Sequence, residues 1–492
     1  MLRNRLNPKH NLCLFTILFV TVSGALAQTS PTSFSGSTAA QQSTSESPIP
    51  NLSDALGQNP FSGSISGEKL VAGSVPITLL DAIDRGLKYN LGLYTSQQTS
   101  ETVRAARMHA LSELLPSLSA RASESVQQIN LAAFGFAPPT GSPIVGPFGV
   151  TDIRAAATAP IIDFQALNKL RSADQNTQAA QFNLRNAREL VVVAVGLSYV
   201  QALAAEARVD DVQAQLRTAE SLYKQALDQK NAGVTPAIDV LRAQVEMQAQ
   251  QTRLLSFRNS LDKEKLQLGR VIGLPSAQEF TLAQKIPFRP GPPLTLEESI
   301  GRALRDRPDF AAAQARVRAA EYTLHASQSE RLPKLGINGD YGVIGKTLGE
   351  SHGTFSAAAA LTVPIFQGGR IRSDIAQSES ALKLRQAEAD DMRGRIEYEV
   401  RSAFLDLTST AEQVRVAQSS VELAAQTLTQ AQDRFRAGVT NNIEVVQAQE
   451  ALANSNETLI SSTLQFNLAK LALARSIGVA ERATKEFLGG NP

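Results

Sequence analysis

The chain carries ITLLDAIDRGL at residues 77–87 and a similar segment, LTLEESIGRAL, at residues 294–304. Three shorter matches follow in the same order in both halves. A Leu-Pro pair ends at Pro116 and again at Pro333. Gly-Val-Thr occurs at 233–235 and 438–440, and Ile-Gly occurs at 272–273 and 477–478. Self-similarity at a long period is the sequence signature of a repeated structural unit. We therefore expect one unit written twice, over residues 75–275 and 294–480, with a linker at 276–293.

Each copy contains a segment with the pattern of a β-hairpin. Pro116 and Pro333 should end the helices before them, because proline lacks an amide N–H and forces the preceding residue toward extended geometry. After Pro333, apolar residues alternate with polar ones, which is the period of a strand. We expect strands within about 117–162, on either side of a Pro/Gly loop at 137–149, and within about 334–366. Strands of about 9–12 residues are long enough to cross an outer membrane when tilted.

Long helices should follow each hairpin. Residues 164–231 and 370–437 contain no proline and one glycine each. At about 1.5 Å per residue, such a helix extends roughly 100 Å. Apolar positions such as Val212, Leu216 and Ala219 recur every three or four residues, as in coiled coils. Shorter return helices should follow the glycine turns, and short helices at 77–115 and 294–332 should complete the bundle.

The N-terminus has the three parts of a secretory signal peptide. Basic residues precede an apolar run from Leu12 to Val22, and a small-residue site ends at Ala27. We expect a signal peptide at 1–27, which contains the chain's one cysteine, Cys13. A flexible Ser/Thr/Gln/Pro-rich arm should cover 28–74 and a short tail 481–492.

Composition argues against catalysis and against nucleic-acid binding. The 48 Lys+Arg are balanced by 46 Asp+Glu, whereas a nucleic-acid binder is strongly basic. One cysteine and four histidines leave little for a metal site, so we expect no metal and no cofactor. Ser221-Leu-Tyr-Lys224 matches a hydrolase motif, but it falls inside an expected long helix and has no companion motif. We expect a protein that is not an enzyme.

Two hairpins supply four strands per chain. Four strands cannot close a barrel, and an open sheet leaves unpaired backbone groups in lipid. If the strands cross a membrane, several chains must share one barrel, and three chains would supply twelve strands. The expected fold is mainly α with a small membrane β part, built from duplicated long helical hairpins and two β-hairpins.

The sequence resembles the TolC family of outer-membrane efflux ducts from about Ile77 to Ala480. The resemblance rests on the duplicated Leu-Pro, on VPIFQGG at 363–369, and on RFRAGV at 434–439 followed by IEVV at 443–446. It implies a homotrimer in the outer membrane, with a shared twelve-stranded barrel in lipid and an α-helical tunnel in the periplasm. It also implies two partners, a periplasmic adaptor and an inner-membrane transporter.

The resemblance also implies roles for residues at the two helical turns. The turns that dock the adaptor in the family correspond here to Gly233 and Val234 and to Gly438 and Val439. The alternative is that these residues only form the turn between two helices and bind no partner. Asp239 and Glu444 stand where the family often has acids near the periplasmic mouth. Rings of carboxylates select cations, but an acid in the first turns of a helix also simply stabilises the helix dipole.

Two further positions are gate candidates. Gln447 stands where some members have a second acid, and Phe435 is an aromatic just before the second turn. The arginine that latches the mouth in some members is replaced here by Thr440, for which Arg434, Arg436 or Arg242 could substitute.

A different class of protein fits part of this pattern. A periplasmic coiled-coil adaptor or structural protein would also have a signal peptide and a long helical hairpin. Such proteins have one hairpin on β-rich modules, whereas here two hairpins alternate with short strand pairs.

Overall fold

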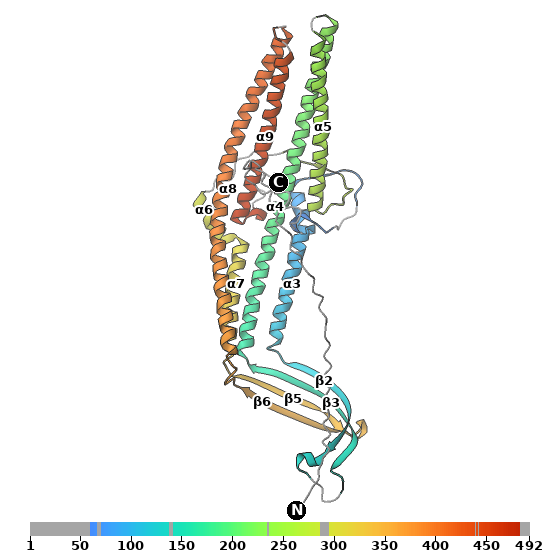
Figure 1. The fold of residues 1–492 in the computed structure, drawn as a ribbon, viewed down its shortest axis with the longest axis vertical. Coiled ribbons are helices and arrows are strands. Elements are labelled where there is room, and N and C mark those ends of the chain that lie inside the picture. The colour runs from blue at the N-terminus through green and yellow to red at the C-terminus, as the bar shows by residue number, and fades with distance from the viewer. Residues whose placement is uncertain are drawn as a thin grey trace, which may run out of the picture. The chain divides into compact units, whose positions relative to one another are not determined.

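We describe a computed structural model of the chain (Figure 1). The chain divides into two units, 1–51 and 52–492, and all described residues belong to the second. The structure describes residues 60–65, 70–136, 141–233, 236–285, 295–437, 439–440 and 442–482. The expected signal peptide, most of the arm and nearly all of the C-terminal tail lie outside these ranges.

One order of elements occurs twice, as two helices, two strands and two long helices. In the first half these are α2 (Leu79–Tyr89), α3 (Leu91–Ser112), β2 (Ser117–Asn130), β3 (Ile144–Ile162), α4 (Phe164–Asn231) and α5 (Ala237–Val271). In the second half they are α6 (Leu296–Asp306), α7 (Pro308–Ser329), β5 (Lys334–Gly345), β6 (His352–Thr362), α8 (Arg370–Arg436) and α9 (Asn442–Ile477). Short elements complete the described chain: β1 (Val75–Ile77), β4 (Phe280–Leu282) and the 3-10 turns η1 (Pro60–Ser62), η2 (Leu131–Phe134) and η3 (Leu348–Glu350).

The repeated segment that opens each half starts a helix in the same way. Thr78 caps α2 by accepting the N–H of Asp81, and the Asp81 carboxylate accepts the N–H of Thr78 in return. Thr295 and Glu298 form the same capping box on α6. Each box satisfies two amide donors that a helix start otherwise leaves unpaired. The similarity of the two segments therefore has a local physical cause.

The short helices expected at 77–115 and 294–332 are each broken in two. At Asn90 the backbone is extended, and the side chain accepts the N–H groups of Gly92 and Leu93, so it caps a new helix. At Arg307 the backbone is also extended, because Pro308 disfavours helical geometry in the residue before it.

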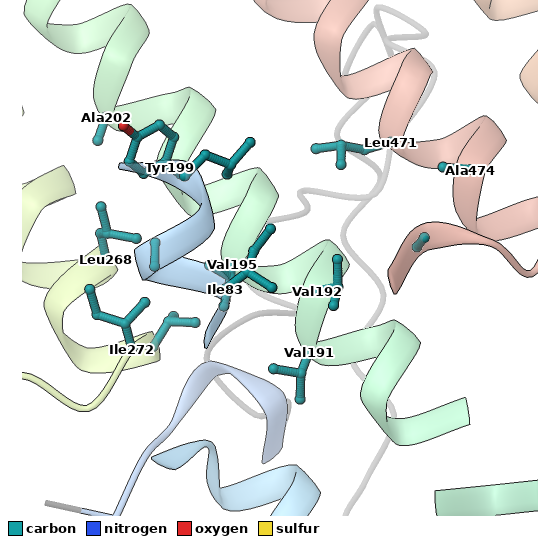
Figure 2. Packing of buried hydrophobic residues seen from close by; sticks show 14 of the residues in the cluster. Ile83, Val191, Val192, Val195, Tyr199, Ala202, Leu268, Ile272, Leu471 and Ala474 are labelled. Carbon is teal, nitrogen blue, oxygen red and sulfur yellow. The ribbon is translucent and has the colours of Figure 1, made fainter. Parts of the chain in front are cut away.

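The core lies where the middle of α4 meets α2, α5 and α9 (Figure 2). Val191, Val195 and Tyr199 of α4 are almost fully buried there, and the Tyr199 hydroxyl donates to the carbonyl of Ile77 at 3.1 Å. Burial raises the pKa of this phenol, so it stays protonated. Among the described residues, one helix, α4, is long and apolar enough to cross a membrane, with a mean hydropathy of 1.8 over an 18-residue window. Because 67% of that window is buried, its apolar residues serve the core.

Four strands form one antiparallel sheet in the order β2-β3-β5-β6, at one end of the long helices (Figure 1). Strand β3 begins at Ile144, inside the segment expected to be a loop, and is therefore longer than expected. Strands β1 and β4 form a separate parallel pair, and β4 lies in the segment expected to be a linker. Neither β2 nor β6 has a second neighbour among the described residues, so the sheet is open at both edges.

Candidate functional site

The four-stranded sheet has one polar and one apolar face. Residues directly opposite in antiparallel pairs share a face, and successive residues alternate between faces. The register places these residues on the polar face: Ser117, Ser119, Arg121, Ser123, Asp152, Arg154, Asn338, Asp340 and Ser356. The opposite face is mainly apolar, with Glu124 and Thr151 as polar members, and carries Leu118, Ala120, Val126, Ile153, Ala155, Ala157, Ile337, Tyr341, Val343, Phe355, Ala357 and Leu361.

The apolar face is exposed, which is unusual for a soluble protein. Leu118 and Phe355 are each 79% exposed and Tyr341 is 68% exposed. A contiguous apolar patch of this kind marks a surface that meets lipid or protein. Alternation of apolar and polar residues is also the pattern of a barrel strand between lipid and a wet interior.

Charged side chains pair with one another across the polar face. Arg154 Nε lies 2.8 Å from Asp152 Oδ1, and Arg154 Nη1 lies 2.8 Å from Asp340 Oδ1. The arginine therefore ties β3 to β5 through side chains as well as through the backbone ladder. Among the described residues, no group of three or more His, Cys, Asp and Glu could hold a metal ion.

The first helical turn lies at the other end of α4. Gly233 has φ 73°, the left-handed conformation that glycine adopts cheaply after a helix. Its amide donates to the carbonyl of Lys230, and a Cβ added to it would have no atom within 4 Å. Val234, the second docking candidate here, lies outside the described residues.

The second turn joins α8 to α9. Gly438 lies outside the described residues, whereas Val439 is 70% exposed and its amide donates to the carbonyl of Arg434. An exposed branched side chain at a tip is what a docking site would require.

The two acidic candidates differ in their surroundings. Asp239 is 7% exposed, and its Oδ1 lies 3.3 Å from Arg242 Nη1. Glu444 is half-buried, accepts a short hydrogen bond from the Thr440 hydroxyl and lies 3.6 Å from Arg434 Nε. Two of the three arginines named as latch candidates thus pair with an acidic gate candidate. The third, Arg436, pairs with Asp433.

The remaining gate candidates, Phe435 and Gln447, differ in burial. Phe435 is 5% exposed and packs with Leu222 of α4 and Val445 of α9, so its ring belongs to the core of the helical end. Gln447 is exposed. Both positions are compatible with a mouth, but within one chain only Gln447 presents its side chain to solvent.

Sequence reasoning missed a buried ionic cluster in the middle of the chain. Arg307 binds Asp309 with two nitrogens, at 2.7 and 3.0 Å, and Glu399 with the third, at 2.5 Å. Arg475 Nη2 lies 3.5 Å from Asp309. The members come from three parts of the sequence, and only the dipeptide Arg307-Pro308 gives a local signal, that of a helix boundary.

Comparison with known proteins identifies matches over most of the chain. Residues 82–274 and 299–479 match the family described as "Outer membrane efflux protein". The alkaline protease secretion protein AprF of Pseudomonas aeruginosa is 24% identical over 341 residues, which cover 68% of this chain and 70% of AprF. The outer membrane efflux protein BepC of Brucella suis is 23% identical over 408 residues, 79% of this chain and 87% of BepC.

Solved structures share the fold. The outer membrane protein VceC of Vibrio cholerae superposes with a TM-score of 0.70 at 18% identity, over 81% of this chain and 96% of VceC. The open state of the MtrE outer membrane channel of Neisseria gonorrhoeae gives 0.69 at 18% identity, over 85% of this chain and 95% of MtrE.

Proposed function

Because the chain belongs to the outer membrane efflux protein family, we infer that it is the outer-membrane duct of a tripartite efflux or secretion system. It resides in the outer membrane and works with a periplasmic adaptor and an inner-membrane transporter. The match covers both helical hairpins and both strand pairs, so it favours the duct over the alternative of a periplasmic adaptor, which has one hairpin.

One observation carries the proposal, namely an open four-stranded sheet with an exposed apolar face. In lipid, unpaired strand edges are too costly to persist. Pairing β2 of one chain with β6 of the next removes both edges. It also keeps neighbouring strands antiparallel, because β2 and β6 run in opposite directions. Three chains then form one twelve-stranded barrel with the apolar face toward lipid and the polar face inside.

The same arrangement makes the helices a tunnel. Long helices from three chains leave the barrel on one side, and the two halves of each chain contribute equivalent hairpins. We attribute this equivalence to a duplication of one unit, residues 75–275 and 294–480, because the same order of elements occurs in each.

Site roles follow from the position of the turns. We assign adaptor docking to Gly233, Val234, Gly438 and Val439; of these, the described residues Gly233 and Val439 follow the ends of α4 and α8 that are away from the sheet. Asp239 and Glu444, with Gln447 and Phe435 nearby, form the mouth in this proposal. The duct performs no chemistry of its own: the transporter supplies the energy, and adaptor contact shifts the mouth from closed to open.

In this proposal the inner-membrane transporter, rather than the duct, selects the cargo. The names of the relatives include protease secretion, pyoverdine export and toluene efflux, which are chemically unrelated cargoes. A wide passive duct suits all of them, because selection takes place before the cargo enters it.

Disulfide cross-linking tests the shared barrel. Cys13 is the chain's one cysteine and lies in the expected signal peptide, so introduced cysteines would be the only ones in the mature protein. We would place a cysteine at Ala120 on edge strand β2 and a second at Phe355, Ala357, Ala359 or Leu361 on edge strand β6. All five positions lie on the apolar face. We expect at least one pair to link three chains covalently, because a disulfide forms when Cα atoms lie about 4.4–6.8 Å apart.

The register supplies a matched control. Ala120 and Ala155 are directly opposite within one chain, so A120C/A155C should cross-link inside the monomer without joining chains. If that control forms its disulfide while no edge pair joins chains, the β2–β6 closure is wrong.

A further inference from the structure

In the part of the bundle next to the sheet, four helices lie side by side in the order α3, α4, α7 and α8 (Figure 1). Helices α3 and α8 are the outer two of this row. Helix α3 leads into the edge strand β2, and α8 follows the edge strand β6. The outer helices therefore lie at the same two edges of the chain as the strands that the proposed barrel joins.

Helices α4 and α8 agree in their buried positions when residues 205 apart are compared. This offset is the one between the glycines that follow the two helices, Gly233 and Gly438 (438 − 233 = 205). Three pairs at this offset are each no more than 3% exposed: Val191 and Ile396, Val195 and Val400, and Val212 and Ala417. A residue of α4 and its counterpart in α8 thus have corresponding places in the two halves.

One face of α8 is exposed although the corresponding face of α4 is buried. Ala179 and Ser172 of α4 are 3% and 8% exposed, whereas their counterparts Leu384 and Gln377 lie on the surface, Leu384 at 57% exposure. On α4 this face is covered by α7, because Ser172 donates to a backbone carbonyl of α7 at 2.9 Å. The chain by itself therefore leaves uncovered on α8 the face that α7 covers on α4.

Helix α3 shows the complementary difference from α7. The two Leu-Pro pairs at the ends of these helices set the offset between them at 217 (333 − 116 = 217). Ala315 and Ala319 of α7 are 0% and 4% exposed, whereas their counterparts Gln98 and Thr102 of α3 are exposed. Ala319 supplies the carbonyl that Ser172 contacts. Helix α3 is therefore uncovered on the face that α7 turns toward α4.

Two side-chain hydrogen bonds join α4 to α7 near the sheet. Asn168 Nδ2 donates to Ser329 Oγ at 3.0 Å, and Gln165 Nε2 donates to Glu330 Oε1 at 2.7 Å. Both bonds connect the long helix of the first half to a short helix of the second half. Equivalent contacts between two chains would connect the long helix of the second half, α8, to a short helix of the first half, α3.

The counterparts of all four residues are exposed on α3 and α8. The pattern Ser-Glu-x-Leu-Pro at the end of α7 recurs at the end of α3, so the two acceptors correspond to Ser112 and Glu113. The offset along the long helices makes Ser373 and Arg370 the counterparts of the two donors. All four side chains lie on the surface of the single chain.

Arg370 and Glu113 are complementary in charge. Within its own chain, Arg370 Nη1 lies 2.9 Å from Glu330 Oε2, and Glu113 Oε2 lies 3.6 Å from Lys169 Nζ. The side chains of Arg370 and Glu113 are nevertheless 56% and 38% exposed. Both therefore keep surface for a second partner of opposite charge.

We propose that α8 of one chain packs against α3 of the next chain as α4 packs against α7 within a chain. The contact lies beside the β2–β6 pairing, so it rests on the proposed trimer and extends that assembly from the strands into the helices. Arg370 forms an ion pair with Glu113 of the next chain, Ser373 lies against Ser112 of the next chain, and Leu384 becomes covered.

Disulfide cross-linking of the purified mature protein tests this contact. S112C/S373C should convert most chains to a covalent trimer on a non-reducing gel, because the two positions approach within disulfide distance only between chains. N168C/S329C is the matched control, since it places the corresponding bond between α4 and α7 and should close inside the monomer. Circular dichroism of the reduced variants checks that their helices are intact.

S112C/S378C is the control for the face of α8. The hydroxyl of Ser378 lies 2.8 Å from that of Ser327 on α7 of the same chain, so this side chain points toward its own chain. S112C/S378C should therefore yield far less covalent trimer than S112C/S373C, and equal yields would overturn the proposal.

The β2–β6 cysteine pairs separate failure of this contact from failure of the proposed function. If a pair that includes Ala120 joins chains and N168C/S329C closes, but S112C/S373C does not join chains, then solvent or another protein covers these helix faces and the proposal is wrong while the barrel stands. If neither kind of pair joins chains, both the helix contact and the shared barrel are wrong.

Discussion

Arg307 is the residue on which the middle of the molecule depends. Its side chain is 2% exposed and connects the start of α7 to α8 through Asp309 and Glu399. It also donates to the carbonyl of Ser476 at the end of α9. One guanidinium group therefore joins the end of the last helix to both elements, and the bidentate contact to Asp309 fixes its orientation.

Replacing Arg307 by methionine should destabilise the protein by about 3 kcal/mol, because it leaves the largely buried carboxylate of Asp309 without its bidentate partner. Burial alone would raise the pKa of Asp309, but the hydrogen bonds and charge of Arg307, helped by Arg475, hold it below its usual range. A lowered pKa means that the ionised acid favours the folded state. This contribution is present above the ordinary aspartate pKa of about 3.9 and is lost as pH falls through the lowered value.

The difference in unfolding free energy between wild type and R307M should therefore be largest near neutral pH and shrink at acid pH. Denaturant unfolding followed by helical circular dichroism at both pH values measures it. Arg415→Met, which breaks an exposed Arg–Glu pair, is the control and should change stability by less than about 1 kcal/mol. Equal losses of unfolding free energy in R307M and R415M would show that the buried cluster stabilises the protein no more than an exposed ion pair does.

The ends of the two longest helices follow from the proline and glycine residues that bound them. Helix α4 begins and ends where the proline-free stretch predicted, and α8 ends one residue early. The breaks at Asn90 and Arg307 were missed, because an asparagine cap and an Arg-Pro pair are weak signals within a helical pattern. The buried ionic cluster was also missed, since its members meet only in the folded chain.

For the candidate residues at the helical turns, the sequence likewise predicted position along the chain but not burial or contacts. Spacing from each glycine was enough to place Asp239 and Glu444 in the first turns of α5 and α9. It could not show that Asp239 is buried and paired with Arg242, or that Phe435 faces its own core. Alanine-rich helices give little contrast between faces, so the pattern alone does not tell inward from outward.

Two glycines that both follow helices should respond differently to substitution. Gly273 has φ 74°, and a Cβ there would lie 2.5 Å from Tyr89 Cβ, whereas a Cβ at Gly233 meets nothing. Gly233→Ala should cost only the left-handed strain of about 1–2 kcal/mol. Gly273→Ala should cost clearly more, because Tyr89 must also move. Thermal unfolding of both variants compares the two, and an equal loss would show that the turn after α5 is not tightly packed.

At the scale of the whole molecule, three facts point to one assembly. The sheet is open at both edges and apolar on one exposed face, the helices continue from one end of it, and the family is one of outer-membrane efflux proteins. A shared barrel satisfies the strand edges and the apolar face together. The acids at the tips would become rings in a trimer, because symmetry places three copies of each around one axis.

Ion selectivity tests the acidic mouth separately from the duct. Rings of carboxylates favour cations, so the wild-type channel should prefer K⁺ over Cl⁻, and D239N/E444Q should lose most of that preference. Reversal potentials in a salt gradient measure it. Unchanged selectivity in the variant would remove Asp239 and Glu444 from the mouth while leaving the duct in place.

Conductance across a planar bilayer tests whether three chains make one continuous passage. We would insert the purified protein and, beside it, D239N/E444Q, in which the acidic partners of Arg242 and Arg434 at the tips are neutralised. We expect discrete conductance steps, larger or more frequent in the variant. Trimers of both proteins that insert into the bilayer and never conduct would contradict this expectation.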